Sequence, residues 1–242
     1  MFKLETHCHT YGTSVCATTP NELIVKFYKD MGYKGIVVTN HFQKHVYDCY
    51  LQGNTCKEKL DWFFNDFDNF KNLCNKNGIR AFFGVEVRVK DERTLNGTEY
   101  VVLGLDKEVF YREDKIFNLN QKELFELVNQ KKGFMYQSHP FRTGVCQGDP
   151  LYMHGAESFN GHYHHKNHND LALDFCEKNS LIKLSGTDFH HEDQPITAGI
   201  IVNDNVSTEK DLINALFSGE FTLIEDKETY EKRLLEYENS KK

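Results

Sequence analysis

The chain has 242 residues and a net charge of −7 at neutral pH, from 36 acidic and 29 basic residues. This length allows one large core, and a single barrel of this size is ordinary. Proteins that bind long DNA or RNA by neutralising phosphates normally carry a basic excess, and none is visible here. We therefore expect no long nucleic acid as partner. A small phosphorylated substrate remains compatible, because a metal site carries its own positive charge.

The cysteines and the N-terminus bear on the cellular setting. Seven cysteines occur without regular spacing and without a CxxC pair, which argues against a structural zinc finger. Residues 1–5 lack the pattern of a signal peptide, and no apolar run approaches membrane-spanning length. We predict a cytoplasmic protein with no membrane partner, in which most cysteines are small core residues. The oligomeric state stays open.

Strand-like and helix-like segments alternate along the chain. The apolar patterns predict strands at residues 2–6, 35–39, 79–89, 100–103, 134–136, 156–159, 181–184, 198–202 and 221–224. They predict helices near 20–31, 60–74, 121–131, 167–179 and 208–218, and residues 227–242 form a charged terminal helix or frayed tail. Thr19 precedes Pro20 and Glu22 and is the predicted cap of the first helix. Asn96-Gly97 predicts a tight turn.

Repeated strand and helix segments favour a mostly parallel sheet. Polar residues follow many of the strands, and in a parallel barrel this rim is where active sites form. An open doubly wound sheet would gather them at one crevice only, so a closed or nearly closed barrel fits better. No linker, low-complexity tract or internal repeat divides the chain. We predict one domain over 1–242, with a core at about 2–224 and a charged tail at 227–242.

Two short clusters near opposite ends of the chain predict a metal site. His7 and His9 alternate on one predicted strand and therefore project to the same side, and Asp188 and His190 do so after another strand. Imidazole nitrogens and carboxylate oxygens are the usual ligands of zinc, manganese or iron in hydrolytic sites. We interpret the two clusters as halves of one site.

Five motifs occur in order along the chain: His7-x-His9, Thr39-Asn40-His41, Gly84-x-Glu86, Ser138-His139-Pro140 and Gly186-Thr187-Asp188-x-His190. Together they resemble the motifs of the PHP (polymerase and histidinol phosphatase) superfamily, over about residues 4–224. The resemblance implies an α/β fold, a distorted (β/α)7 TIM-like barrel. It also implies a metal-dependent phosphoesterase with two or three zinc, manganese or iron ions. Known members act on histidinol phosphate or on nucleotides and oligonucleotides, or are polymerase-associated domains.

The resemblance also implies a ligand set. The implied metal ligands are His7, His9, His41, Glu86, His139, Asp188 and His190, with Cys16 as a further candidate. His7 and His9 would hold one ion with Glu86 and Asp188. His41 and His190 would hold a second, and Glu86 would bridge toward a third ion bound by His139.

The chain departs from the family pattern at three places. Residues 11–16 contain neither the histidine nor the acid that many relatives place there, so a Cys16 thiolate or a water would have to substitute. Residues 100–103 lack the histidine that many relatives contribute to a third ion, which leaves two and three ions both open. Asn40 replaces a commoner aspartate and removes one carboxylate beside the ligands.

Other side chains are candidates for catalysis and substrate binding. We predict that Arg142, Asp188 and His190 serve catalysis, and that Arg142, Asn160 and His191 bind substrate. The Arg142 guanidinium suits two phosphate oxygens, and a salt bridge at the rim is the alternative. His191 and His45 could protonate a leaving group or be ordinary loop residues. The segment 161–168 is dense in histidine, which suggests a nickel- or zinc-binding tract, although its place in a loop favours a polar rim.

The sequence therefore predicts a phosphoric ester hydrolase acting on a small metabolite or nucleotide through a metal-activated water. Histidinol phosphate is one specific substrate to consider. The missing ligand positions leave a non-catalytic metal-binding regulatory domain as the alternative. Metal-assisted amide hydrolysis would require a carbamylated lysine or a four-histidine layout, and no suitably placed lysine stands out.

Overall fold

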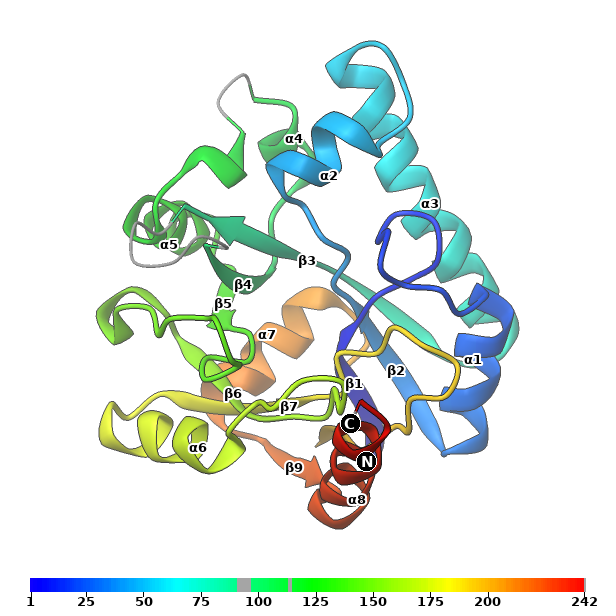
Figure 1. Ribbon diagram of the computed structural model, residues 1–242. Coiled ribbons are helices and arrows are strands. Elements are labelled where there is room, and N and C mark those ends of the chain that lie inside the picture. The colour runs from blue at the N-terminus through cyan, green and yellow to red at the C-terminus, as the bar shows by residue number, and fades with distance from the viewer. Residues whose placement is uncertain (91–96, 113–114, 242) are drawn as a thin grey trace.

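A computed structural model describes residues 1–90, 97–112 and 115–241 (Figure 1). The strands are β1 (Phe2–Cys8), β2 (Tyr33–Val38), β3 (Arg80–Val89), β4 (Thr98–Leu103), β5 (Phe134–Gln137), β6 (Gly155–Asn160), β7 (Ile182–Gly186), β8 (Ala198–Val202) and β9 (Phe221–Glu225). The α-helices are α1 (Asn21–Asp30), α2 (Lys44–Cys49), α3 (Cys56–Lys76), α4 (Lys107–Phe110), α5 (Gln121–Gln130), α6 (Asn169–Lys178), α7 (Glu209–Ser218) and α8 (Lys227–Ser240), with 3-10 turns at Ile116–Asn118 and Pro150–Tyr152. Each predicted segment has its counterpart, and the sequence patterns missed only short elements such as α2 and α4.

Side-chain caps begin four of the described α-helices, namely α3, α5, α7 and α8. The Thr55 hydroxyl accepts a hydrogen bond from the backbone of Glu58, whose side chain bonds back to Thr55, and this capping box begins α3. The predicted cap at Thr19 was wrong, because its hydroxyl lies 3.3 Å from the carbonyl oxygen of His190 and Pro20 precedes α1 without a side-chain cap. Asn96 of the predicted tight turn lies outside the described residues.

The strands form one sheet in the order β7-β6-β5-β4-β3-β2-β1-β8-β9. β1, β2 and β3 are parallel to one another, and so are β5, β6 and β7. β4 runs antiparallel between these two groups, and β8 and β9 extend the sheet antiparallel beyond β1. The expectation of a mostly parallel sheet was therefore only partly right. The connections from β3 to β4 (residues 90–97) and from β7 to β8 (residues 187–197) are too short for a crossover helix.

Contacts at the end of β1 bring the two sides of the sheet together. Cys8 forms a parallel bridge with Phe189, which follows β7, and the His9 amide donates to the Phe189 carbonyl at 3.1 Å. The sheet is therefore nearly closed, as the predicted distorted TIM-like barrel requires. In Figure 1, α1 and α3 cover one side of this ring of strands, while α5 and α6 cover the other.

The barrel interior is apolar away from the rim. Leu4, Val37, Phe82 and Tyr136 belong to one buried cluster inside the sheet. Side chains of α7, including Leu212, Ile213 and Leu216, join the same cluster, so this helix closes one end of the barrel. The polar residues that end the strands are thereby left at the opposite rim.

The charged C-terminal segment is ordered as helix α8. Its Tyr230 is buried against Phe159 and Tyr163, so the segment packs on the barrel. The organisation as one domain stays a prediction. Among the described residues, no helix is long and apolar enough to cross a membrane.

Candidate metal centre

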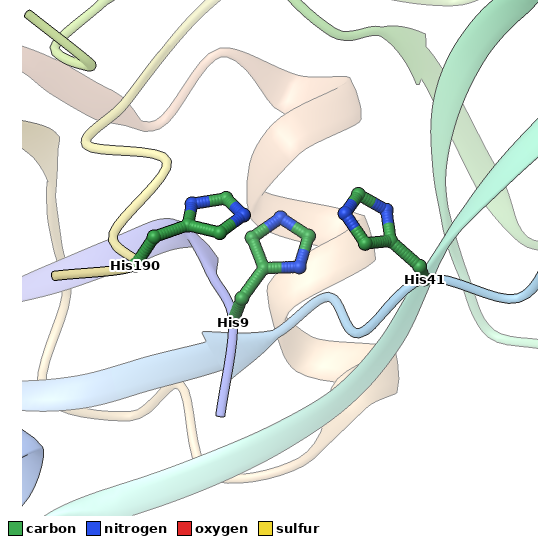
Figure 2. Close-up of side chains that lie close together, drawn as sticks. All are labelled: His9, His41 and His190. Carbon is green, nitrogen blue, oxygen red and sulfur yellow. The ribbon is translucent and has the colours of Figure 1, made fainter. Parts of the chain in front are cut away.

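Seven ionisable side chains from separate strand ends converge at the rim. This rim cluster consists of His7, His9, His41, Glu86, His139, Asp188 and His190. Figure 2 shows His9 between His41 and His190, with ring centroids 4.3 and 4.1 Å from its two neighbours. The structure thus brings together all the implied His, Glu and Asp ligands.

His7, His9 and Asp188 form the deepest part of the rim cluster. The Nε2 atoms of His7 and His9 lie 3.1 Å apart, and the Oδ1 atom of Asp188 lies 3.4 and 3.3 Å from them. Two imidazole nitrogens can share only one proton in a hydrogen bond, whereas a cation about 2.1 Å from each would fit between them. The donor set therefore suits a metal ion.

Glu86 lies between three histidines. Its Oε2 atom is 2.7 Å from Nδ1 of His41, and its Oε1 atom is 3.4 Å from Nε2 of His7 and 3.3 Å from Nε2 of His139. Oε1 is buried and has no hydrogen-bond partner among the described residues. A buried, unpaired carboxylate oxygen is costly unless a cation satisfies it, so Glu86 suits a position bridging two ions.

The sequence analysis missed Glu99. Its Oε2 atom lies 3.6 Å from Nε2 of His139, and Glu99 groups with His41 and Glu86 as a possible ligand set. Arg88 and Gln43 donate to the other oxygen of Glu99, each at 2.7 Å, and this fixes the carboxylate. The predicted strand began at residue 100, one position too late to include Glu99. Glu99 and Val101 are two positions apart on β4 and therefore face the same side, and Val101 pairs with Glu86 on β3. This two-residue alternation is the sequence signal that could have located Glu99.

Cys16 lies at the mouth of the rim cluster. Partial burial raises the pKa of its thiol, but the interactions with His190 and His41 outweigh this and lower the pKa from 9.0 to about 6. A thiol with this pKa is largely thiolate at neutral pH, the form that binds metal ions. Ser14, from the same loop, contacts Nδ1 of His9 at 3.0 Å instead of entering the cluster.

Unusual backbone conformations hold two of the ligands. Asp188 has φ 53° and His139 has φ 31°, a region that side chains other than glycine rarely adopt. Next to Asp188, a Cβ atom at Gly186 would approach Glu157 Oε1 and His7 Cβ to 2.6 Å. The glycine of the Gly186-Thr187-Asp188 motif is therefore needed for the close approach of β7 to the ligands on β1.

Residues around the rim cluster fix its orientation. Glu157 Oε1 lies 2.7 Å from Nδ1 of His7, and Glu157 Oε2 accepts from the His139 amide at 2.8 Å. Arg142 donates to Asp188 at 2.5 Å and to Asn160 at 3.0 Å. Arg142 thus forms the ion pair that was the alternative to a phosphate clamp, while still facing the pocket.

The charges in the rim cluster are strongly coupled. Burial opposes protonation of His7, yet Asp188, Glu157 and Glu86 raise its pKa well above 6.5. Burial lowers the pKa of His9, and His190 and His41 lower it further. Burial opposes ionisation of Glu86, but His7 and the adjoining histidines hold its pKa well below 4.5. Glu86 is therefore ionised and His9 neutral at neutral pH, which are the forms that bind cations.

A pocket of about 570 Å³ opens over the rim cluster. Arg88, Arg142 and Lys241 line it together with His191, whereas His45 lies on the exposed surface of α2. A second hollow, of about 670 Å³, lies between α3 and α7, and no histidine is among the described residues that line it. The ligand-rich pocket is therefore the candidate active site.

The sequence as a whole was compared with known families. The PHP domain family matches residues 5–229, nearly the whole chain. The chain belongs to the PHP domain family. This confirms the resemblance inferred from the five motifs. None of the curated proteins matches the chain.

Several solved structures share the fold of this chain. PsfC from Pseudomonas syringae has a TM-score of 0.66 and 14% identity, with 99% of this chain and 98% of that chain covered. A Bacteroides vulgatus two-domain protein, described as containing a predicted PHP-like metal-dependent phosphoesterase, has a TM-score of 0.63 and 17% identity, covering 98% and 69%. A lesion-specific endonuclease from Pyrococcus furiosus has a TM-score of 0.58 and 14% identity, covering 92% and 57%. At these identities the PHP domain shares the fold with them, and its chemistry must be argued from its own residues.

Proposed function

We propose that this PHP domain hydrolyses a phosphate ester of a small metabolite or nucleotide. The observation that carries the proposal is the Glu86 carboxylate, which lies within 3.4 Å of His7, His41 and His139 at the base of one pocket. Clustered imidazoles and carboxylates of this kind suit two adjacent divalent ions.

The residues divide into groups around these ions. His7, His9, Glu86 and Asp188 would hold one ion, His41, His190 and Cys16 a second, and His139, Glu86 and Glu99 a third. Zinc, manganese or iron bound there would lower the pKa of a water to about 7 and neutralise charge on the phosphate.

The protein's own side chains would orient the substrate. Arg142 lies at the pocket wall and is held by Asp188, Asn160 and Asn167, so its guanidinium is fixed in direction. We assign Arg142 and Asn160 to positioning a phosphate, and Asp188 and His190 to the chemistry as ligands. His191 lines the same pocket, and we assign it to substrate binding.

The size and charge of the pocket favour a small substrate. A volume of about 570 Å³ matches the range of small-molecule sites. Arg88, Arg142 and Lys241 offer positive charge at the wall, although the chain as a whole is acidic. The similarity to an endonuclease concerns the fold, so a nucleic-acid end belongs among the substrates to be tested.

A phosphatase screen tests the proposal. The purified chain loaded with Mn²⁺ or Zn²⁺ should release phosphate from an aryl phosphate or from a panel that includes histidinol phosphate, nucleotides and short oligonucleotides. The doubly substituted protein His9→Ala/Asp188→Ala should lose this activity, and His45→Gln, on exposed α2, should retain it. Turnover that survives both chelation by EDTA and the double substitution would overturn the proposal.

Metal counting separates an enzyme from a non-catalytic metal-binding domain. Two or three tightly bound ions together with turnover support the enzyme. Bound ions without turnover on any substrate of the panel would favour the regulatory alternative.

A further inference from the structure

Three histidines outside the rim cluster form a second group. His162 and His164 come from the loop after β6, and His191 follows the ligand His190. One nitrogen of each lies within 4.8 Å of the others. We propose that these three residues, the loop histidine cluster, bind one transition-metal ion of their own, separate from the ions of the rim cluster.

His162 provides an observation that itself points to a ligand. Its side chain is buried, with 5% of the residue exposed, and its Nδ1 atom has no hydrogen-bond partner among the described residues. A buried ring nitrogen without a partner costs free energy, because water solvates it in the unfolded chain. The rings around His162 are other imidazoles, with centroids 5.3 Å away for His164 and 6.0 Å for His191. A shared cation would provide the His162 ring nitrogen with the partner that the neighbouring imidazoles do not provide.

The other two rings are held in place from outside the loop histidine cluster. The Thr18 hydroxyl lies 3.1 Å from Nδ1 of His191, which leaves Nε2 of that ring for an ion. Oxygen contacts of this kind orient metal-bound histidines in many sites. The His164 ring stacks on Tyr237 of α8 at 4.4 Å and meets the edge of Tyr163 at the same centroid distance. These contacts restrict both rings to directions facing the pocket.

The distances of up to 4.8 Å between the histidine nitrogens would have to shorten slightly for the three rings to bind one ion. A tetrahedral zinc ion with bonds of about 2.05 Å places its nitrogens about 3.4 Å apart, so the rings need to move by about an ångström. His164 and His191 are only partly buried, so their rings can make this shift while keeping the contacts that orient them, and the buried His162 serves as the anchor.

The ligand atoms determine which metal ions the loop histidine cluster can bind. Three imidazoles without a carboxylate suit Zn²⁺, Co²⁺, Ni²⁺ or Cu²⁺ and disfavour Mg²⁺ and Ca²⁺, which prefer oxygen ligands. Three protein ligands leave a fourth position open toward the pocket, where a water or an anion can bind. The His162 ring lies 5.1 Å from the ring of the rim ligand His190, so the two metal sites share one pocket wall.

Metal stoichiometry tests the proposal without any assay of activity. The full-length chain, stripped with a chelator, is reloaded with Zn²⁺ or Co²⁺ and its bound metal counted by mass spectrometry. His164→Gln and His191→Gln should each bind one ion fewer per chain than the unchanged protein. His168→Asn is the matched control, since it lies in the same loop outside the loop histidine cluster and its φ of 48° suits asparagine.

A second background separates this site from the rim cluster. His9→Ala/Asp188→Ala removes rim ligands and should retain the Co²⁺ ion of the loop histidine cluster, with a tetrahedral visible spectrum. Adding His164→Gln to that background should lower the number of bound Co²⁺ ions by one per chain. Equal metal counts in the unchanged, His164→Gln and His191→Gln proteins would overturn the proposal, and so would a rim-deficient protein that binds no ion. Circular dichroism checks folding, and two independent substitutions keep the test decisive if one variant misfolds. An unchanged protein that holds this ion yet hydrolyses no phosphate ester would refute only the proposed function.

Discussion

The Oε1 atom of Glu157 lies 2.7 Å from Nδ1 of His7, and both side chains are fully buried. The carboxylate contacts Nδ1 of His7 and thereby orients the ring, so that Nε2 faces His9 and Asp188. The same carboxylate accepts from the His139 amide at 2.8 Å, and thus ties β1 to the loop after β5.

Glu157→Gln should weaken metal binding. A glutamine oxygen can still accept from His7, but without the negative charge it makes the imidazole a weaker donor to a cation. Loss of such a partner typically costs about 10–100-fold in affinity. Competition titration with a chromophoric chelator measures the metal affinity. Glu177→Gln, at an exposed position of α6, should bind the metal as the unchanged protein does. Equal affinity in both variants would show that Glu157 serves only to hold the fold.

Glu99→Gln should selectively weaken binding of the third ion, the one assigned to His139, Glu86 and Glu99. Among the described residues, Glu99 and Glu86 are the only acidic groups within 4 Å of a ring nitrogen of His139. The charge of Glu99 therefore decides whether a third cation is held there. We expect about a 10-fold or greater loss of affinity for that ion, or about 1.4 kcal/mol, with the other ions retained. Isothermal titration of the stripped protein resolves the sites, with Glu108→Gln on α4 as control. Loss of all ions together would contradict a separate third site.

Cys16 offers a test of ligand substitution. Because the pKa of its thiol falls to about 6 beside His190 and His41, we expect the thiolate to take part in binding the ion between these two histidines. Cys16→Ser should weaken that ion by about 10-fold or more, whereas Cys16→Asp should retain it. Co²⁺ spectra provide the readout, since a thiolate ligand gives an intense charge-transfer band that serine would remove. Cys49→Ser on α2 controls for general cysteine effects. An unchanged spectrum in Cys16→Ser would show that the thiolate is not a ligand, and that a water takes this place on the ion between His41 and His190.

The sequence was informative wherever ligands share a short motif. Alternation on one strand placed His7 and His9 together, and the strand-end pattern located His41, Glu86 and His139. The sequence analysis missed Glu99 because a single carboxylate near the start of a strand is also common at exposed positions. Its role depends on the antiparallel pairing of β4 with β3, which places Arg88 opposite it.

Long-range packing explains the other differences. The expected parallel order failed at β4 and β8, because the connections that lead into these strands (residues 90–97 and 187–197) are too short for a crossover helix. The loop histidine cluster depends on His191 meeting a loop almost 30 residues earlier, a proximity that follows from the parallel pairing of β6 with β7. Arg142 was predicted near the metal site, but its hydrogen bonds to Asp188 and Asn160 required the tertiary structure.

Glu5 predicts how stability depends on pH. Burial raises the pKa of this carboxyl from 4.5 to about 7, although Thr187, His7 and Tyr28 donate hydrogen bonds that oppose the rise. Because the folded state holds this proton more tightly than the unfolded chain, stability from Glu5 is fully present below pH 4.5. It is lost as pH rises through about 7, by up to about 3 kcal/mol.

Glu5→Gln should remove this dependence while keeping an oxygen for the amides of His7 and Thr187, each 2.9 Å from Oε1. Urea unfolding of the metal-free protein at pH 5 and pH 8 measures the effect. We expect the variant to gain stability relative to the unchanged protein at pH 8 and little or none at pH 5. Glu22→Gln, at the exposed start of α1, should follow the unchanged protein at both values. A variant that is destabilised equally at both pH values would show that Glu5 is ionised in the fold and that its charge is needed to join β1 to the Asp188 loop.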